Sequence, residues 1–158
     1  MKKKITFLME WLRPAGIVVA FFMSESLGTD AASKLHILGP LITIIMCGTV
    51  ALEALFLGKE AAEKIGYAPN RAYQIQSGLA NLAIAVTAVF VYAFSWGVFA
   101  DATITTVMLT FFTFSAANHT VTIIKDRNTK TTNLMRPIMT IILLIFILPH
   151  LIRAVAKN

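Results

Sequence analysis

Glu53, Asn81 and His119 stand inside long apolar stretches of this sequence. A glutamate and a histidine can exchange protons, and an asparagine both donates and accepts hydrogen bonds. Such groups are costly in an apolar environment, so they usually face a partner or a cavity rather than lipid. These three residues are therefore the first candidates for a functional site.

Polar residues also recur at helical spacing in two of these stretches. One set, at positions i, i+3, i+4 and i+7, consists of Gln74, Ser77, Gly78 and Asn81. The second set consists of Ser115, Asn118, His119 and Thr122. This spacing places side chains on one face of a helix. Each stretch is thus predicted to turn a polar face toward its neighbours.

The polar groups lie at similar depths along their stretches when residues are counted from the flanking basic loops. At a rise of about 1.5 Å per residue, Glu53, Asn81 and His119 each lie roughly 6 to 12 Å deep. Arg136 begins the last stretch at the same end. We predict a polar pocket that opens at this end, with the ligand-binding residues Glu53, Gln74, Gln76, Asn81, Asn118, His119 and Arg136.

The function that this pocket favours is the binding or movement of a small molecule or lipid. Two alternatives stay open. The polar groups can bond to one another across helix contacts, at about 0.6 to 2 kcal/mol per pair, in an accessory or oligomer-forming subunit. A membrane enzyme with Glu53 and His119 as acid and base is the weaker alternative. Membrane lipids are expected partners for all three functions. The accessory or oligomer-forming subunit would also have a homo-oligomer or a membrane complex as its partner.

The sequence contains no complete set of residues for a metal site, a disulfide or a known catalytic mechanism. His36 and His150 lie near the boundary opposite His119, so three histidines cannot share one metal ion. Cys47 is the single cysteine, which excludes an internal disulfide. The sequence has no paired carboxylates, nucleophile–base set or Gly-rich phosphate loop. We therefore predict no catalytic residue, no metal and no cofactor.

The apolar stretches themselves define the class of protein. Hydrophobic residues make up 57% of the 158 residues and charged residues 14%, and the mean hydropathy is +0.73. A hydrocarbon core of about 30 Å needs a helix of about 20 residues, and the stretches that approach this length are 5–23, 37–57, 72–95, 102–124 and 137–152. Continuous apolarity favours helices over barrel strands. The prediction is an all-α transmembrane helical bundle of about five spans, forming a single domain over residues 1–158.

Positive charge is unevenly distributed among the connecting segments. With the N-terminus inside, cytoplasmic segments would hold ten of the fourteen basic residues: Lys2, Lys3, Lys4, Lys59, Lys64, Arg71, Lys125, Arg127, Lys130 and Arg136. This distribution follows the positive-inside rule. We predict a cytoplasmic N-terminus in a bacterial-type inner membrane. The net charge of +6 then reflects orientation, and nucleic acid is not expected as a partner.

The first stretch is the least regular of the five. Glu10, Arg13 and Pro14 interrupt it, and a proline inside a helix removes a hydrogen bond. A helix at the membrane surface, which leaves four spans, is therefore an alternative. A cleaved signal peptide is a third interpretation, against which the two charges argue. If the stretch spans the membrane, Glu10 and Arg13 would line the mouth of the pocket.

The two long basic loops contain residues that end or begin helices. In 58–71, residues 60–63 are predicted to extend the preceding helix, which breaks at Gly66 before a turn at 68–70. In 125–136 the sequence is polar throughout, and Pro137 suits the first position of the last helix. Neither loop is long enough to form a separate domain.

One segment resembles a known family. Residues 72–82, Ala-Tyr-Gln-Ile-Gln-Ser-Gly-Leu-Ala-Asn-Leu, and the pair Asn118-His119 are similar to a family of small multi-pass membrane proteins. That family carries Phe-Gln, an acidic residue, Gly and Ala-Asn-Leu at this spacing, and it has no established activity. The resemblance covers about the second half of the chain and implies importance for Gln74, Gly78, Asn81 and His119. More distantly, the layout is similar to DoxX-like four-helix membrane proteins.

The sequence departs from the family pattern in two ways. Gln76 stands where the family has an acidic residue, and the last stretch contains no Asp or Glu. A proton-linked role inferred from those acids therefore does not carry over to this chain.

Overall fold

Six α-helices make up the described part of the chain, and residues 2–157 contain no strand. The computed structural model describes residues 2–157. Its helices are α1 (Lys2–Leu27), α2 (Ala31–Phe56), α3 (Gly58–Ile65), α4 (Arg71–Ala93), α5 (Val98–Lys125) and α6 (Thr131–Ala156). All of these except α3 are long and apolar enough to cross a membrane. The predicted all-α class, with five such helices, is confirmed.

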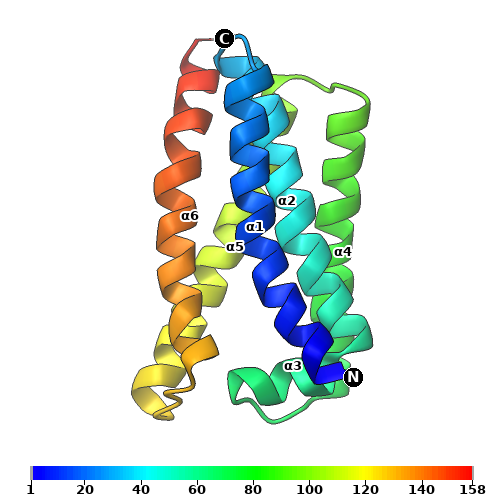
Figure 1. Cartoon of the computed structure of the whole chain (residues 1–158), viewed down its shortest axis with the longest axis vertical. Coiled ribbons are helices and arrows are strands. Elements are labelled where there is room, and N and C mark those ends of the chain that lie inside the picture. Colours follow the sequence, from blue (N-terminus) through cyan, green and yellow to red (C-terminus); the bar gives the residue numbers. More distant parts are fainter. Residues whose placement is uncertain (1, 158) are drawn as a thin grey trace.

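The central helix of the bundle is α2. It contacts α1, α4, α5 and α6, and α4 and α6 lie on opposite sides of it in Figure 1. The short α3 lies across one end of the bundle, close to the N-terminus (Figure 1). We call this the α3 end, and we call the opposite end, where the C-terminus lies, the far end.

The fifth long helix, α1, extends from one end of the bundle to the other. Its N-terminal part slants across α2 toward the α3 end (Figure 1), and Pro14 lies inside it. Arg13, Ala20 and Ser24 are buried against the rest of the bundle, and the Ser24 hydroxyl donates to the Lys34 carbonyl at 2.9 Å. These contacts make α1 part of the packed bundle and not a separate surface helix.

Apolar residues of all five long helices contribute to the core. Leu38 and Ile42 of α2, Met108 of α5 and Ile147 of α6 are almost completely buried in one cluster. Burial of such side chains contributes about 1.5 to 3 kcal/mol each relative to exposure in water. Within a membrane, where lipid also is apolar, the gain comes from close packing instead.

Gly78 lets α4 approach α2 closely. A Cβ atom added at this position would lie 2.8 Å from Cγ of Leu55 and 3.2 Å from Cβ of Ala54, both on α2. The first distance is shorter than ordinary van der Waals contact. The position therefore needs glycine for packing. Small residues allow close approach at many other contacts between membrane helices.

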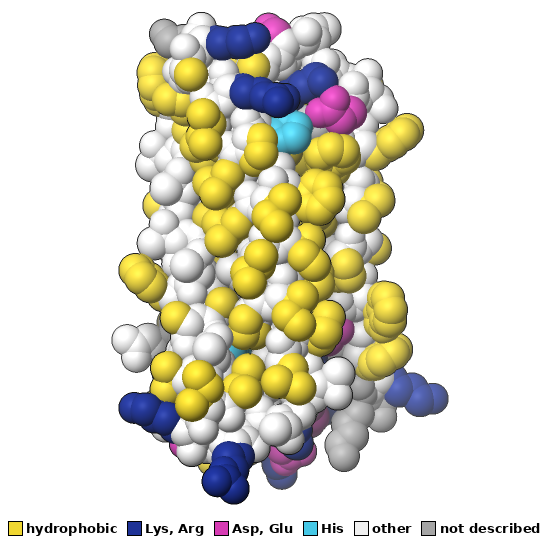
Figure 2. All heavy atoms as spheres, turned by 90° about the vertical axis from the view of Figure 1, so that its left-hand side faces the viewer, with side chains coloured by type: hydrophobic (Ala, Val, Ile, Leu, Met, Phe, Trp, Pro, Cys, Tyr) yellow, Lys and Arg dark blue, Asp and Glu magenta, His cyan; other side chains and the backbone are white. Residues whose placement is uncertain are grey.

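The surface shows the pattern expected for a bilayer. On the face shown in Figure 2, hydrophobic side chains cover the middle of the molecule, and Lys and Arg side chains gather at its two ends. Large apolar side chains are exposed on the outer faces of the long helices, for example Phe22, Leu79, Phe114 and Ile145. Exposure of so many large apolar side chains to water would be unfavourable, so the helices are compatible with integral membrane insertion.

The loop 58–71 differs in detail from its prediction. Helix α2 ends at Phe56, and α3 is a separate helix rather than an extension of α2. The Arg71 guanidinium donates to the carbonyls of Ala54 and Leu55 at 3.1 and 2.9 Å, which satisfies the last turn of α2. Gly66 ends α3 with a φ of +90° in the left-handed region, as predicted for this glycine.

The prediction that Pro137 begins the last helix is wrong. Helix α6 starts at Thr131 and passes through Pro137. Its first turn carries Asn133, which is completely buried and bonds to side chains of α5. These tertiary contacts favour helix before the proline, although Pro137 lacks the N–H that would bond the carbonyl four residues earlier.

Candidate functional site

Five charged side chains from four helices meet inside the α3 end. They are Glu10 and Arg13 of α1, Glu53 of α2, Lys64 of α3 and Arg136 of α6. We call them the ion-pair network. Arg13 and Glu53 are each only 4% exposed. Buried charges are tolerated only when they are paired, so these residues fix the relative positions of the four helices.

Glu53 is the most fully engaged member of the network. One carboxylate oxygen accepts from Arg13 and the other accepts from Lys64 at 2.8 Å. Arg13 also donates to the Thr49 hydroxyl at 2.9 Å. Both oxygens of Glu53 therefore accept charge-assisted hydrogen bonds from cations, which are stronger than those between neutral groups.

Glu10 joins the remaining cations. Its Oε1 atom accepts from Arg136 at 2.6 Å, from Lys64 at 2.8 Å and from Arg13 at 3.2 Å. The network thus contains three cations and two carboxylates, which leaves one positive charge in excess. In the described part of the chain, no acceptor bonds the buried Nε atom of Arg136.

A second polar group surrounds His119. The imidazole Nδ1 atom lies 3.0 Å from the Tyr67 hydroxyl and 2.7 Å from Oδ1 of Asn133. The Tyr67 and His119 rings stack with centroids 5.6 Å apart. Thr122 lies 3.2 Å from the same hydroxyl and accepts from Asn133 at 3.3 Å. We call these four residues the His119 cluster; it ties α5 and α6 to the segment after α3.

A cavity of about 360 Å³ lies at this end of the bundle, between α4 and α5. Glu53, His119 and Arg136 are among its polar lining residues. Its apolar walls come mainly from α3 and α5: Gly58, Ala61, Ala62, Ile65, Phe111, Phe112, Phe114 and Ala116. The cavity therefore combines charged and apolar surfaces, which is typical of small-molecule sites.

Five of the seven residues predicted to bind a ligand line this cavity. They are Glu53, Gln74, Asn118, His119 and Arg136. Gln74 is buried and donates from Nε2 to the Gly58 carbonyl at 2.9 Å. The sequence pattern thus brings residues of four helices together as predicted, although their role in binding remains a prediction.

The other two predicted residues lie elsewhere. Gln76 is exposed on the outer face of α4 because it is two positions from Gln74, which turns it by about 200° around the helix. Asn81 is completely buried one turn beyond Ser77, whose carbonyl accepts from Asn81 Nδ2 at 2.9 Å. Within residues 2–157, no donor bonds its Oδ1 atom.

Sequence reasoning missed Lys64, Tyr67 and Asn133. Lys64 and Tyr67 lie in a basic loop, where membrane orientation explains a lysine and the membrane boundary explains a tyrosine. Asn133 lay in a segment expected to be loop. The sequence carries no signal for the pairing of Lys64 with Glu53, because this pairing depends on how α3 docks on the bundle.

The far end carries separate ion pairs. His36 Nδ1 lies 3.1 Å from both carboxylate oxygens of Asp101, which is 1% exposed, and stacks on Tyr92. His150 pairs with Glu25 at 3.1 Å. The three histidines are thus dispersed as predicted. Among residues 2–157, no group of three His, Cys, Asp or Glu side chains is placed to hold a metal ion.

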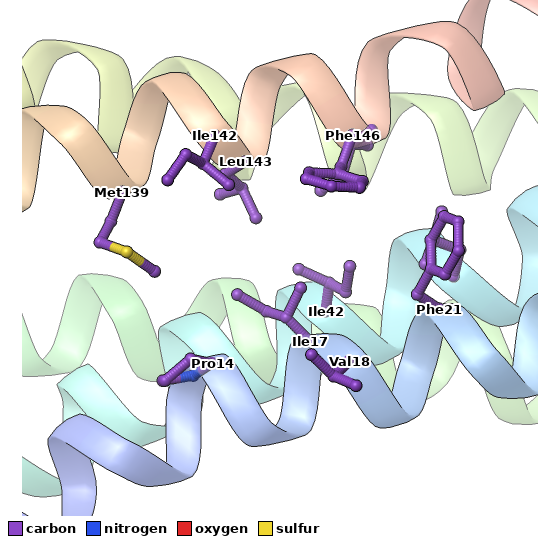
Figure 3. Close-up of a pocket in the computed structure, with 11 residues that line it drawn as sticks. Pro14, Ile17, Val18, Phe21, Ile42, Met139, Ile142, Leu143 and Phe146 are labelled. Atoms are coloured by element: carbon purple, nitrogen blue, oxygen red, sulfur yellow. The ribbon is translucent and has the colours of Figure 1, made fainter.

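A second hollow lies between α1 and α6, with α2 at its floor. Pro14, Ile17 and Val18 face Met139 and Ile142 across it (Figure 3). Its volume is about 210 Å³, and every lining residue is apolar. Because it offers no polar group, the cavity between α4 and α5 is the candidate functional site.

The fold and the charge pattern define a multi-pass helical membrane bundle. The chain belongs to DUF6790, a family of unknown function, which it matches over residues 14–158. Glu10 and Arg13 of the ion-pair network lie before the matched region. No curated protein and no solved structure matches the chain. The resemblance to a family of small multi-pass membrane proteins is confirmed at this level, and the likeness to DoxX-like proteins remains a prediction.

Proposed function

We propose that this protein binds, or moves, a small molecule or lipid in the cavity between α4 and α5. The observation that best supports this function is the mixed lining of the cavity. The buried Glu53 and His119 and the partly buried Arg136 line it together with the exposed aromatic residues Tyr73 and Phe114. A volume of about 360 Å³ falls within the range of roughly 300 to 1,000 Å³ of drug-sized sites.

The distribution of basic residues supports an orientation for this site. The segments at the α3 end hold most of the lysines and arginines, including Lys59, Arg71 and Lys130. On the positive-inside rule, this end with the N-terminus faces the cytoplasm of a bacterial-type inner membrane. The cavity would then open in the cytoplasmic half of the bilayer.

Two other functions have less support. An accessory or oligomer-forming subunit would use its polar groups as helix-packing contacts, and the ion-pair network and the His119 cluster do bond across helices. Helix packing alone, however, does not require a cavity lined by charged groups. A membrane enzyme would need Glu53 to exchange a proton, but both its oxygens accept from cations.

A substitution that fills the cavity tests the proposal. Ser115 lines the cavity and is half-buried, whereas Ala117 is exposed two positions along the same helix. We expect native mass spectra of the protein, purified from membranes in mild detergent, to show a bound mass in the wild type. The Ser115→Phe variant should lose this mass, and the matched Ala117→Phe variant should keep it.

The fold of each variant is checked by helical circular dichroism and by its elution as a single species. A bound mass that persists in folded Ser115→Phe would contradict the proposal, because the ligand would then lie outside this cavity. The same conclusion would follow if no bound mass appeared in the wild type, with or without added lipid extract.

A further inference from the structure

We infer that the ligand of this cavity is an amphiphile with an anionic headgroup, a phosphate or a carboxylate, which enters from the bilayer between α4 and α5 and places its headgroup at Arg136. This inference rests on the proposed function and names its ligand class. Three features carry it: the charge of the ion-pair network, the position of Arg136 and the opening of the cavity.

The charge of the network favours an anion. Three cations face two carboxylates, and both oxygens of Glu53 and the Oε1 atom of Glu10 already accept from those cations. Among the described residues of the network, the cations therefore outnumber the carboxylates by one in a largely buried site. An uncompensated charge in such a place is unfavourable, so an anionic group would stabilise the α3 end.

Arg136 is the cation that a ligand can reach. It lines the cavity, whereas Arg13 and Lys64 do not. Its Nη2 atom bonds to Glu10, but in the described part of the chain its buried Nε atom has no acceptor. A guanidinium is suited to phosphate and carboxylate groups, to which it donates two parallel hydrogen bonds.

The opening of the cavity indicates a ligand with an apolar tail. Helices α4 and α5 join at the far end and diverge toward the α3 end (Figure 1). The rim between them carries exposed Tyr73 of α4 and exposed Phe114 of α5, and Phe111 and Phe112 line the cavity behind it. These apolar side chains lie in helices long enough to span the bilayer, so the opening faces lipid. A tail can remain between α4 and α5 while the headgroup reaches Arg136.

Native mass spectrometry with added probes tests the ligand class. The probes are phosphatidylglycerol, phosphatidylcholine of the same chain length, and inorganic phosphate. The variants are Arg136→Gln, which removes the charge, Arg136→Lys, which keeps it, and Arg153→Gln as a control at the far end of the same helix. We expect the wild type to bind phosphatidylglycerol at least tenfold more tightly than phosphatidylcholine. Arg136→Gln should weaken this binding at least tenfold, and Arg136→Lys and Arg153→Gln should retain it.

The outcomes separate this inference from the proposed function. Loss of bound lipid in Ser115→Phe, with equal binding of both lipids or no effect of Arg136→Gln, would overturn the anionic class and leave the cavity as a binding site. Persistence of bound lipid in Ser115→Phe would overturn both. Stabilisation by inorganic phosphate without any bound phosphatidylglycerol would show a soluble anion and contradict the amphiphile. If Arg136→Gln fails to fold, the lipid preference of the wild type still decides the inference.

Discussion

Glu53 illustrates how a single residue organises the α3 end. Its side chain connects α1 and α3 through Arg13 and Lys64, and all three are part of the ion-pair network. An acidic residue in a membrane-spanning helix is costly unless its partners come with it. The network therefore defines how α1 and α3 dock on α2.

Replacement of Glu53 by glutamine should strongly destabilise the fold. The variant keeps the shape of the side chain but leaves Arg13 and Lys64 with too few carboxylate partners, and loss of one member of a buried ion pair costs about 3 to 5 kcal/mol. Thermal unfolding in detergent measures the effect. Glu25→Gln at the far end is the control: its pairs with Lys34 and His150 are more exposed, so little change is expected. Equal shifts of the unfolding temperature in the two variants would show that the buried network stabilises the fold no more than the exposed pairs at the far end.

At the residue scale, the sequence predicted the site in part. Glu53, His119 and Arg136 could be identified because charged or polar groups in apolar stretches stand out against their neighbours. Tyr67 and Lys64 could not, because their partners are far away in the chain and a basic or aromatic residue near a membrane boundary has a sufficient explanation in topology. Long-range pairing of this kind depends on how helices dock, which periodicity does not specify.

The helices depend on their packing and on their ends. Contact of α4 with α2 requires Gly78, and α2 begins with a capping arrangement in which the Asp30 carboxylate accepts from the Ser33 backbone N–H at 2.8 Å. The Ser33 hydroxyl in turn accepts from the Asp30 backbone N–H at 3.0 Å. Both features are local and can be tested by single substitutions.

Gly78→Ala should destabilise the packing of α4 on α2. The added methyl group would lie 2.8 Å from Leu55 Cγ, and overpacking of this kind costs about 1 to 3 kcal/mol. Gly48→Ala is a matched control on α2, since the nearest atom to its added Cβ is that of Ala85 at 4.0 Å. We expect a lower unfolding temperature for Gly78→Ala and little change for Gly48→Ala. A larger loss in Gly48→Ala would contradict the close approach at Gly78.

The cap of α2 should depend on pH. The hydrogen bond from the Ser33 backbone holds the pKa of the Asp30 carboxyl below its ordinary value. Because the folded pKa is lowered, the ionised cap stabilises the fold above the unfolded pKa of about 3.9, and this contribution is lost as pH falls through the folded pKa. The unfolding temperature of Asp30→Ala should therefore lie below that of the wild type at neutral pH and approach it in acid. Asp30→Asn, which keeps the cap without ionising, should show no such convergence with Asp30→Ala.

At the element scale, the existence of the long helices could be predicted, but most of their ends could not. Apolar length alone identified five long helices, because the bilayer sets that length. The start of α6 at Thr131 escaped prediction because Asn133, a residue that favours loops and caps, is held in helix by the His119 cluster. Tertiary contacts there outweigh local propensity.

The whole molecule has a charge pattern that predicts its orientation. Five spans would place the two termini on opposite sides of a membrane, and the termini lie at opposite ends of the bundle (Figure 1). The α3 end carries most of the basic residues, so the positive-inside rule predicts that this end faces the cytoplasm.

Reporter fusions measure this orientation directly. An alkaline phosphatase domain, active only outside the cytoplasm, should be active when fused after Thr29 and inactive when fused after Asn128. The two sites lie in the loops at the far end and at the α3 end. An inactive fusion after Thr29 would refute the five-span topology.

The location of a bound lipid is the feature on which the proposed function depends most. A photoactivatable phosphatidylglycerol, supplied at about one molecule per protein and mapped by peptide sequencing, reports that location. We predict cross-links on the cavity-lining segments 73–77 and 111–118, with loss of those cross-links in Ser115→Phe and their retention in Ala117→Phe. Cross-links spread evenly over the lipid-facing surfaces, or concentrated in the apolar hollow between α1 and α6, would contradict binding in the cavity between α4 and α5.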